Sequence, residues 1–150
     1  MQSTLNTQYA DFLKNLSIPE LNEMQVALIE KATASNNLIL LAPTGSGKTL
    51  AFLIAVVNKL TPGQHGVQAL IVAPSRELSL QIEQVFRLMK TSYKVTCCYG
   101  GHSSRIEENS LSEAPAVVIG TPGRLADHIE RKTIDAATIK IVVLDEFDKS

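Results

Sequence analysis

The sequence has few cysteines, no excess of charge of either sign and no long apolar run, and each absence argues against a class of protein. The two cysteines, Cys97 and Cys98, are neighbours in an apolar stretch. Because neighbours on a strand point to opposite faces, neither a disulfide framework nor a metal knuckle is expected. This cysteine usage fits a reducing compartment, and we expect a cytoplasmic protein.

Charge and hydropathy argue against a membrane protein and against a uniformly basic one. The 14 Lys and Arg residues oppose 15 Asp and Glu, which leaves a formal net charge of −1. This balance excludes a polybasic membrane anchor and a uniformly basic protein that coats nucleic acid. Any site that binds a polyanion must therefore be a local part of the surface. The N-terminus lacks the basic start and apolar stretch of a signal peptide, and no apolar run approaches the roughly 18 residues that span a bilayer. We expect a soluble protein without a membrane partner.

What the chain does contain is typical of a globular α/β domain. Its 150 residues, 45% hydrophobic and 19% charged, suffice for one core. Helical patterns separate five short apolar runs, so the sequence predicts an α/β three-layer sandwich with a mostly parallel sheet. Such sheets carry their chemistry at the C-terminal ends of the strands. The predicted strands are residues 38–42, 69–73, 95–99, 116–120 and 141–145.

The first strand end has the pattern of a phosphate loop. Two glycines let backbone N–H groups curl around phosphate oxygens, and the helix that follows adds its positive N-terminus. Lys48 can reach the β- and γ-phosphates, and Thr49 can bind Mg²⁺. A glycine turn before a buried helix would not explain this lysine and threonine together. The predicted nucleotide-binding residues of the loop are Ala42, Pro43, Thr44, Gly45, Ser46, Gly47, Lys48 and Thr49.

The last predicted strand ends in two adjacent carboxylates, Asp145 and Glu146. Asp145 can hold Mg²⁺ through a water molecule, and Glu146 can orient or deprotonate the attacking water. Acidic pairs at strand ends are more often solvated turns, but here a phosphate loop precedes the pair in the same predicted sheet. Nucleoside triphosphate hydrolysis is therefore the leading chemistry, with Lys48, Asp145 and Glu146 as its catalytic residues.

Three further strand ends carry short motifs, which are Pro74, Ser75, Arg76, Glu77 and Leu78; Gly100 and Gly101; and Thr121, Pro122, Gly123 and Arg124. Together with the phosphate loop and the acidic pair, these segments resemble the DEAD-box RNA helicases, and the resemblance runs from about Ser17 to Ser150. Their order and spacing match the first RecA-like domain of that family. Ser75 stands where the family usually has Thr, and Phe147, just before Asp148, stands where it usually has Ala. The resemblance implies a RecA-like phosphate-loop NTPase fold, ATP and Mg²⁺ as cofactors, and ATP-dependent RNA helicase activity.

The resemblance also implies roles that the residue chemistry alone does not assign. The three segments would hold the sugar-phosphate backbone of single-stranded or duplex RNA, with little base readout. Gln25 stands where the family has its adenine-reading glutamine, whose amide can pair with adenine N6 and N7. Taken singly, Gln25 also fits a surface helix, Gly100 and Gly101 fit a flexible turn, and Arg76 fits a helix-surface ion pair.

The segment from Thr7 to Ala34 has the pattern of one or two helices broken near Pro19. By the same resemblance, the helical segment 1–35 carries the adenine-reading motif and is part of the same domain. Residues 36–150 are the first RecA-like helicase domain, incomplete at its C-terminus. In the family, the strand after the acidic motif lies between those at 38–42 and 141–145, so the sheet is expected to have an empty central slot. We expect a monomer that works with a second RecA-like domain in cis, and an inactive fragment without it.

Two other functions stay open on the sequence. A non-catalytic nucleotide-binding or RNA-scaffolding module would need no more than this fragment. A phosphate-loop kinase or transferase lacks a candidate acceptor site here, and the segment from Thr121 to Arg124 argues against it. The histidines His65, His102 and His128 show no metal-ligand spacing and are expected at the surface.

Overall fold

A computed structural model describes residues 1–101 and 103–149 of the chain. These residues group into two compact units, Met1–Lys59 with Val85–Lys90, and Leu60–Gln84 with Thr91–Ser150. Within the described ranges, no helix is both long and apolar enough to cross a membrane.

The first unit is helical, and its third helix begins where a capping pair forms. The Asn22 side chain accepts the Gln25 N–H, and the Gln25 side chain accepts the Asn22 N–H, which satisfies two N–H groups at the helix start. This helix packs against the fourth. The predicted break near Pro19 is confirmed, because no helix covers residues 16–22 of the described chain. The helices are α1 (Gln2–Gln8), α2 (Ala10–Asn15), α3 (Glu23–Ala34) and α4 (Lys48–Lys59).

Residues 38–42, the first predicted strand, are irregular backbone in the structure. Ile39 is 78% exposed and Leu41 is 86% exposed. An apolar run becomes a strand only where its N–H and C=O groups find a neighbouring strand. Among the described residues, no strand pairs with this run. The prediction of a strand is therefore wrong here, and the empty central slot, which requires that strand, stays a prediction.

The second unit contains a four-stranded sheet in the order β2-β3-β1-β4, and every pairing is parallel. Val72 at the end of β1 lies opposite Gly120 of β3 and Leu144 of β4, so the C-terminal ends of these strands share one edge. The other four predicted strands are thus confirmed to within one residue at either end. The elements are β1 (Ala69–Val72), α5 (Arg76–Met89), β2 (Val95–Cys98), α6 (Ser104–Ser112), β3 (Val117–Gly120), α7 (Pro122–Glu130), η1 (Ala136–Thr138), β4 (Ile141–Leu144) and η2 (Phe147–Lys149).

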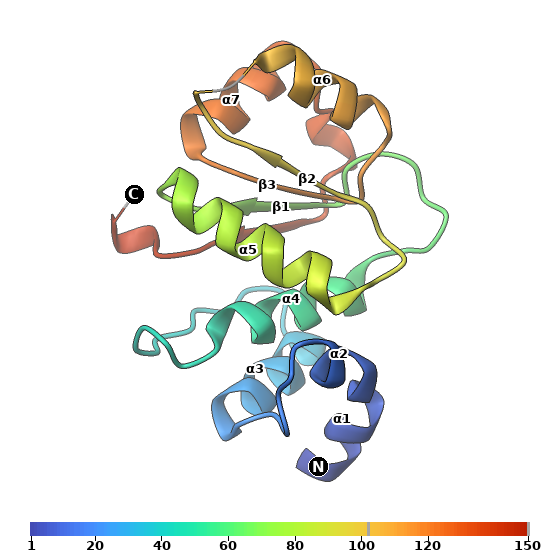
Figure 1. The fold of residues 1–150 in the computed structure, drawn as a ribbon, viewed down its shortest axis with the longest axis vertical. Coiled ribbons are helices and arrows are strands. Elements are labelled where there is room, and N and C mark those ends of the chain that lie inside the picture. Colours follow the sequence, from blue (N-terminus) through green and yellow to red (C-terminus); the bar gives the residue numbers. More distant parts are fainter. Residues whose placement is uncertain (102, 150) are drawn as a thin grey trace. The chain divides into compact units, whose positions relative to one another are not determined.

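Helices lie on both faces of this sheet, as the three-layer prediction requires, although Val142 and Leu144 of the edge strand β4 are each 58% exposed. In Figure 1, α6 and α7 lie on one face and the first part of α5 lies on the other. The face below α6 and α7 is filled by side chains from three strands and both helices, because alternate strand residues point to the same side. That core cluster consists of Val67, Leu70, Cys98, Leu111, Val118, Leu125 and Ile134.

Candidate functional site

The phosphate loop, in the first unit, has the backbone geometry that its glycines predict. Gly45 and Gly47 have φ angles of +82° and +84°, a left-handed region that glycine adopts without strain. Between them, the Ser46 N–H donates to the Pro43 carbonyl at 3.3 Å and closes a turn. Helix α4 begins at Lys48, so its unpaired N–H groups start directly after the loop. N–H groups arranged in this way form a concave anion site.

Side chains complete the fit of this loop to a phosphate group. The Lys48 Nζ donates to the Ala42 carbonyl at 3.0 Å, which places the ammonium group at the loop. Ser46 Oγ is buried and, among the described residues, is the one buried side-chain nitrogen or oxygen without a hydrogen-bond partner. Thr49 follows in the first turn of α4. A cation, a concave backbone and an unsatisfied hydroxyl match the charge and the acceptor oxygens of a nucleotide phosphate.

Gln25, predicted to read adenine, is tied to the phosphate loop. Its Oε1 accepts the Asn22 N–H at 2.9 Å, and its Nε2 donates to the Gly47 carbonyl at 3.1 Å. The Asn22 Nδ2 donates to the Ser46 carbonyl at 3.0 Å. Gln25 is 4% exposed, so the surface-helix alternative is wrong. An amide nitrogen carries two N–H groups, which leaves one for a base, and adenine reading stays a prediction.

The acidic pair follows β4 in the second unit. The Asp145 N–H extends the sheet by donating to the Val72 carbonyl at 2.9 Å. Glu146 has a φ of +48°, which is uncommon outside glycine, and its carboxylate lies 3.3 Å from the Lys149 Nζ. Phe147 is 53% exposed. A meeting of Asp145 with Lys48, which belongs to the first unit, stays a prediction.

Two of the predicted RNA-binding segments meet at the ends of β1 and β2. Ser75 Oγ accepts the Leu78 N–H at 3.2 Å and caps α5. The Arg76 guanidinium lies over the Tyr99 ring, 4.6 Å from its centroid, in a cation–π contact. Gly101 has a φ of +100°, and a Cβ there would lie 3.3 Å from Arg76 Nη1. Arg76 and the glycine pair therefore belong to one site.

The third segment lies at the start of α7 and is held by a buried carboxylate. Arg124 Nε donates to Glu107 Oε2 at 2.7 Å, and Arg124 Nη1 donates to Asp127 Oδ2 at 3.3 Å. The side chain of Arg124 is 19% exposed, whereas that of Glu107 is 1% exposed. The bond between Arg124 and Glu107 joins two charged groups, and such hydrogen bonds are stronger than those between neutral groups. One end of this arginine is therefore fixed inside the protein.

Glu107 lies outside every predicted motif, and both Glu107 and His128 are buried. The surface position expected for His128 is wrong, because its side chain is 0% exposed and its Nε2 lies 2.5 Å from Glu107 Oε2. The other ring nitrogen lies 2.8 Å from Thr133 Oγ1. The signal available in the sequence was the i, i+4 spacing of Arg124 and His128 on one helix, which brings two nitrogen-bearing side chains to one face. His65 is exposed as predicted, and His102 lies outside the described residues.

The cluster formed by Cys98, Glu107 and His128 has ligand atoms within 4.8 Å of one another, but it fits a metal ion poorly. Glu107 Oε2 already accepts from Arg124 and His128, and the guanidinium would repel a cation. Burial, and then the charge of Glu107, raise the pKa of Cys98 to about 12. Cys98 would therefore meet a metal ion as a protonated thiol, whereas the thiolate is the form that binds metals. Burial also raises the pKa of Glu107, but hydrogen bonds from His128, Arg124 and the Tyr99 N–H outweigh burial and hold that pKa below its usual range.

We expect Cys98 to react with iodoacetamide at least tenfold more slowly in the folded chain than in the urea-unfolded chain. The thiolate is the reactive form, and a buried thiol with a pKa of about 12 supplies little of it. Timed labelling at mildly alkaline pH, followed by mass spectrometry, measures both rates. Cys97, half-buried on the same strand, is the internal comparison. Equal rates in the folded and unfolded chains would contradict the burial of Cys98.

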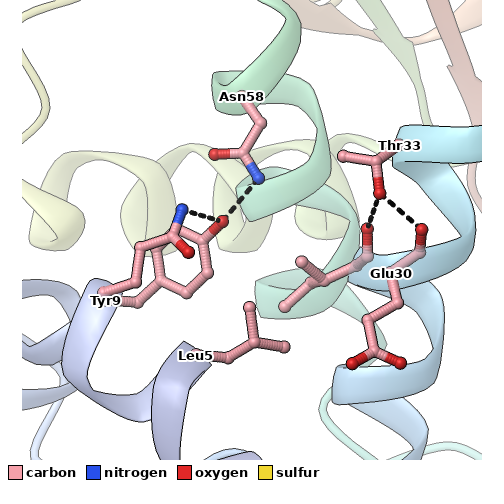
Figure 2. Close-up of a pocket in the computed structure, with 7 residues that line it drawn as sticks. Leu5, Tyr9, Glu30, Thr33 and Asn58 are labelled. Atoms are coloured by element: carbon pink, nitrogen blue, oxygen red, sulfur yellow. Dashed lines mark hydrogen bonds between the residues drawn. The ribbon is translucent and has the colours of Figure 1, made fainter. Parts of the chain in front are cut away.

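A separate pocket of about 340 Å³ lies within the first unit. Figure 2 shows its walls, where the Tyr9 hydroxyl accepts from Asn58 Nδ2 at 2.6 Å and from Gln8 Nε2 at 2.9 Å. Among the described residues that line it, none was predicted to bind nucleotide, metal or RNA. The pocket therefore adds nothing to the predicted site.

Comparison with known proteins places these features in a family. A family model described as DEAD/DEAH box helicase matches residues 22–150. The chain is 35% identical, over 97% of its length, to the DEAD-box ATP-dependent RNA helicase CshA of Bacillus licheniformis, of which it covers 30%. It is 41% identical, over 76% of its length, to the ATP-dependent RNA helicase eIF4A of Aspergillus fumigatus, of which it covers 29%.

A solved structure gives the same result for the fold. The crystal structure of a DEAD box protein from the hyperthermophile Methanococcus jannaschii matches 92% of this chain and 38% of that chain, with a TM-score of 0.84 and 30% identity. The RecA-like fold that the motifs implied is thereby confirmed. The chain spans about 30% of the length of the curated relatives that it matches. The chain belongs to the DEAD/DEAH box helicase family.

Proposed function

We propose that this chain is the ATP- and RNA-binding part of an ATP-dependent RNA helicase. The observation that carries the proposal is the phosphate loop itself, with left-handed Gly45 and Gly47 and with Lys48 at the head of α4. Relatives named as ATP-dependent RNA helicases support it, although the chain covers only about 30% of their length. The activity of the whole protein is thus part of the proposal.

At the nucleotide end, each residue has a role that its chemistry allows. The loop N–H groups and Lys48 would bind the phosphates, and Gln25 would pair with adenine through its remaining N–H. Thr49, and Asp145 through a water molecule, would hold Mg²⁺, which neutralises charge that develops on the transferred phosphoryl group. Glu146 would accept a proton from the attacking water.

At the RNA end, backbone and guanidinium groups would face the sugar-phosphate chain. Arg76 and Arg124 supply positive charge, and the starts of α5 and α7 supply unpaired N–H groups at neighbouring strand ends. Such local placement explains how a chain with a net charge of −1 could bind a polyanion. Contacts to the backbone favour single-stranded or duplex RNA without strong sequence preference.

The same proposal includes a second domain, the oligomeric state and the cellular compartment of the whole protein. A second RecA-like domain in cis would supply the arginine that stabilises the transition state of phosphoryl transfer. The protein would act as a monomer in the cytoplasm. The low number of cysteines and their adjacent positions fit that compartment.

Glu146→Gln tests the catalytic part of the proposal. In the full-length protein we expect ATP binding to survive and RNA-stimulated turnover to fall at least tenfold, because the amide keeps the shape of the side chain but removes the general base. Steady-state ATPase assays measure turnover, and calorimetry measures binding. Glu113→Gln, at an exposed carboxylate paired with Lys94 at 3.7 Å, is the control.

Two results would count against the assignment. Equal turnover of Glu146→Gln and the unchanged protein would remove Glu146 from the mechanism. An unchanged full-length protein that binds ATP and RNA but shows no RNA-dependent hydrolysis would favour the non-catalytic scaffolding module instead.

A further inference from the structure

Glu107 is a buried carboxylate on a helix that has no predicted functional motif. Its side chain is 1% exposed, although its neighbours Ile106 and Glu108 on α6 are open to solvent. Removing a carboxylate from water is costly unless hydrogen bonds and opposite charge compensate for it. The burial of Glu107 therefore requires specific partners, and the identity of those partners indicates what the residue does.

Two partners of Glu107 lie in, or directly before, segments that our proposed function assigns to RNA. Its Oε1 accepts the Tyr99 N–H at 2.9 Å, directly before the glycine pair. Its Oε2 accepts Arg124 Nε at 2.7 Å. The Tyr99 ring in turn lies under the Arg76 guanidinium. One carboxylate thus connects the ends of β2 and β3, and through Tyr99 it reaches the start of α5.

His128 supports the carboxylate from the interior. Its Nε2 donates to Glu107 Oε2, and on the far side of the ring its Nδ1 lies 2.8 Å from Thr133 Oγ1. At least three hydrogen-bond donors, from Tyr99, Arg124 and His128, therefore meet the two carboxylate oxygens. A side chain held by so many bonds has one conformation, and it fixes the groups that it contacts.

The way Arg124 is held leaves part of its guanidinium for a ligand. A guanidinium carries five N–H donors, and the bonds to Glu107 and Asp127 use Nε and one hydrogen of Nη1. Arg124 keeps 19% of its side chain exposed, so the remaining donors can meet an anion. An arginine that is already ordered loses less conformational freedom when it binds a phosphate.

We propose that Glu107 is a positioning residue that orients Arg124, together with the end of β2, for binding of the RNA phosphate backbone. The inference rests on the proposed RNA-binding function and adds to it a residue outside the motifs. Glu107 acts through Arg124 and does not touch the RNA. Its removal should therefore weaken RNA binding only as long as Arg124 is present.

A double-mutant cycle on the 150-residue chain tests this dependence. Fluorescence anisotropy with a fluorescein-labelled oligouridine at low salt measures RNA affinity, and calorimetry measures Mg²⁺-ATP affinity. Glu107→Gln removes the charge and places an NH₂ donor against one of the donors that now bind the carboxylate. Arg124→Gln keeps an amide donor for Glu107 but has no charge for a phosphate. Glu108→Gln, one residue along α6 at an exposed pair with Arg131, is the matched control.

We expect Glu107→Gln to weaken RNA binding about tenfold when Arg124 is present and less than twofold in the Arg124→Gln background. ATP affinity should not change, and Glu108→Gln should bind RNA like the unchanged chain. Equal loss of affinity in both backgrounds, or no loss in either, would overturn the proposal. If Glu107→Gln does not fold by circular dichroism, Glu107→Asp, which keeps the charge but is one methylene shorter, enters the same cycle with the same expected pattern.

Failure of the proposed function gives a different result. A chain that binds Mg²⁺-ATP but shows no RNA binding would overturn the RNA-binding role and this inference together. RNA binding without coupling between positions 107 and 124 would overturn the inference alone.

Discussion

Lys48→Ala is expected to lower the affinity of the chain for Mg²⁺-ATP at least 100-fold. Lys48 is the one cation in the phosphate loop, and its Nζ lies 3.0 Å from the Ala42 carbonyl at the loop itself. Hydrogen bonds to charged groups are worth roughly 1.5–3 kcal/mol each, so the loss of contacts to two phosphates corresponds to about 3 kcal/mol or more. Isothermal titration calorimetry gives the dissociation constants directly.

The same helix supplies the control for this experiment. Lys59, the last residue of α4, donates to the Ser35 carbonyl at 3.4 Å, away from the loop. Lys59→Ala removes the same charge from the same helix, and ATP affinity should stay within a factor of about two of that of the unchanged chain. Unchanged affinity in Lys48→Ala, with a native circular dichroism spectrum, would refute the assignment of the phosphate loop.

Gly120→Ala is expected to lower the free energy of unfolding by about 3 kcal/mol. Gly120 ends β3, in the middle of the sheet and directly before the Thr121 segment. A Cβ at this position would overlap the Cys98 carbonyl oxygen and lie 2.9 Å from Leu125 Cδ2. The carbonyl belongs to the sheet backbone and accepts the Thr121 N–H at 3.2 Å, so no rotamer change relieves the overlap. Urea denaturation followed by circular dichroism measures the change.

A second glycine, three residues along the chain, shows the opposite behaviour. At Gly123 in α7, a Cβ would meet no described atom within 4 Å. Gly123→Ala should leave stability unchanged or raise it by up to about 1 kcal/mol, because alanine loses less backbone freedom in a helix. If Gly120→Ala unfolded at the same urea concentration as Gly123→Ala, the close packing of β3 against β2 and α7 would be wrong.

The site residues were predictable to different degrees, and the difference follows from how far apart the interacting groups lie in the sequence. The phosphate loop is local: its glycines, lysine and following helix are contiguous, so eight residues specify its shape. In the structure Gly45 and Gly47 adopt left-handed φ angles, and the helix that was predicted to follow the loop begins at Lys48. Glu107, in contrast, lies 17 residues from Arg124 and 21 residues from His128. No local periodicity marks such a set of partners.

Local sequence patterns predict four parallel strands, of which the edge strand β4 is half exposed, the helices between them, and the motifs at the strand ends. Two other features depend on contacts between residues that are far apart in the sequence. Residues 38–42 have the composition of a strand but form none in the described chain, because a strand needs a partner for its backbone groups. A histidine without a motif is expected at the surface, but His128 is buried because Glu107 and Thr133 give both of its ring nitrogens a hydrogen-bond partner. Backbone pairing and the burial of polar groups depend on neighbours in space, and these are specified only when the chain has folded.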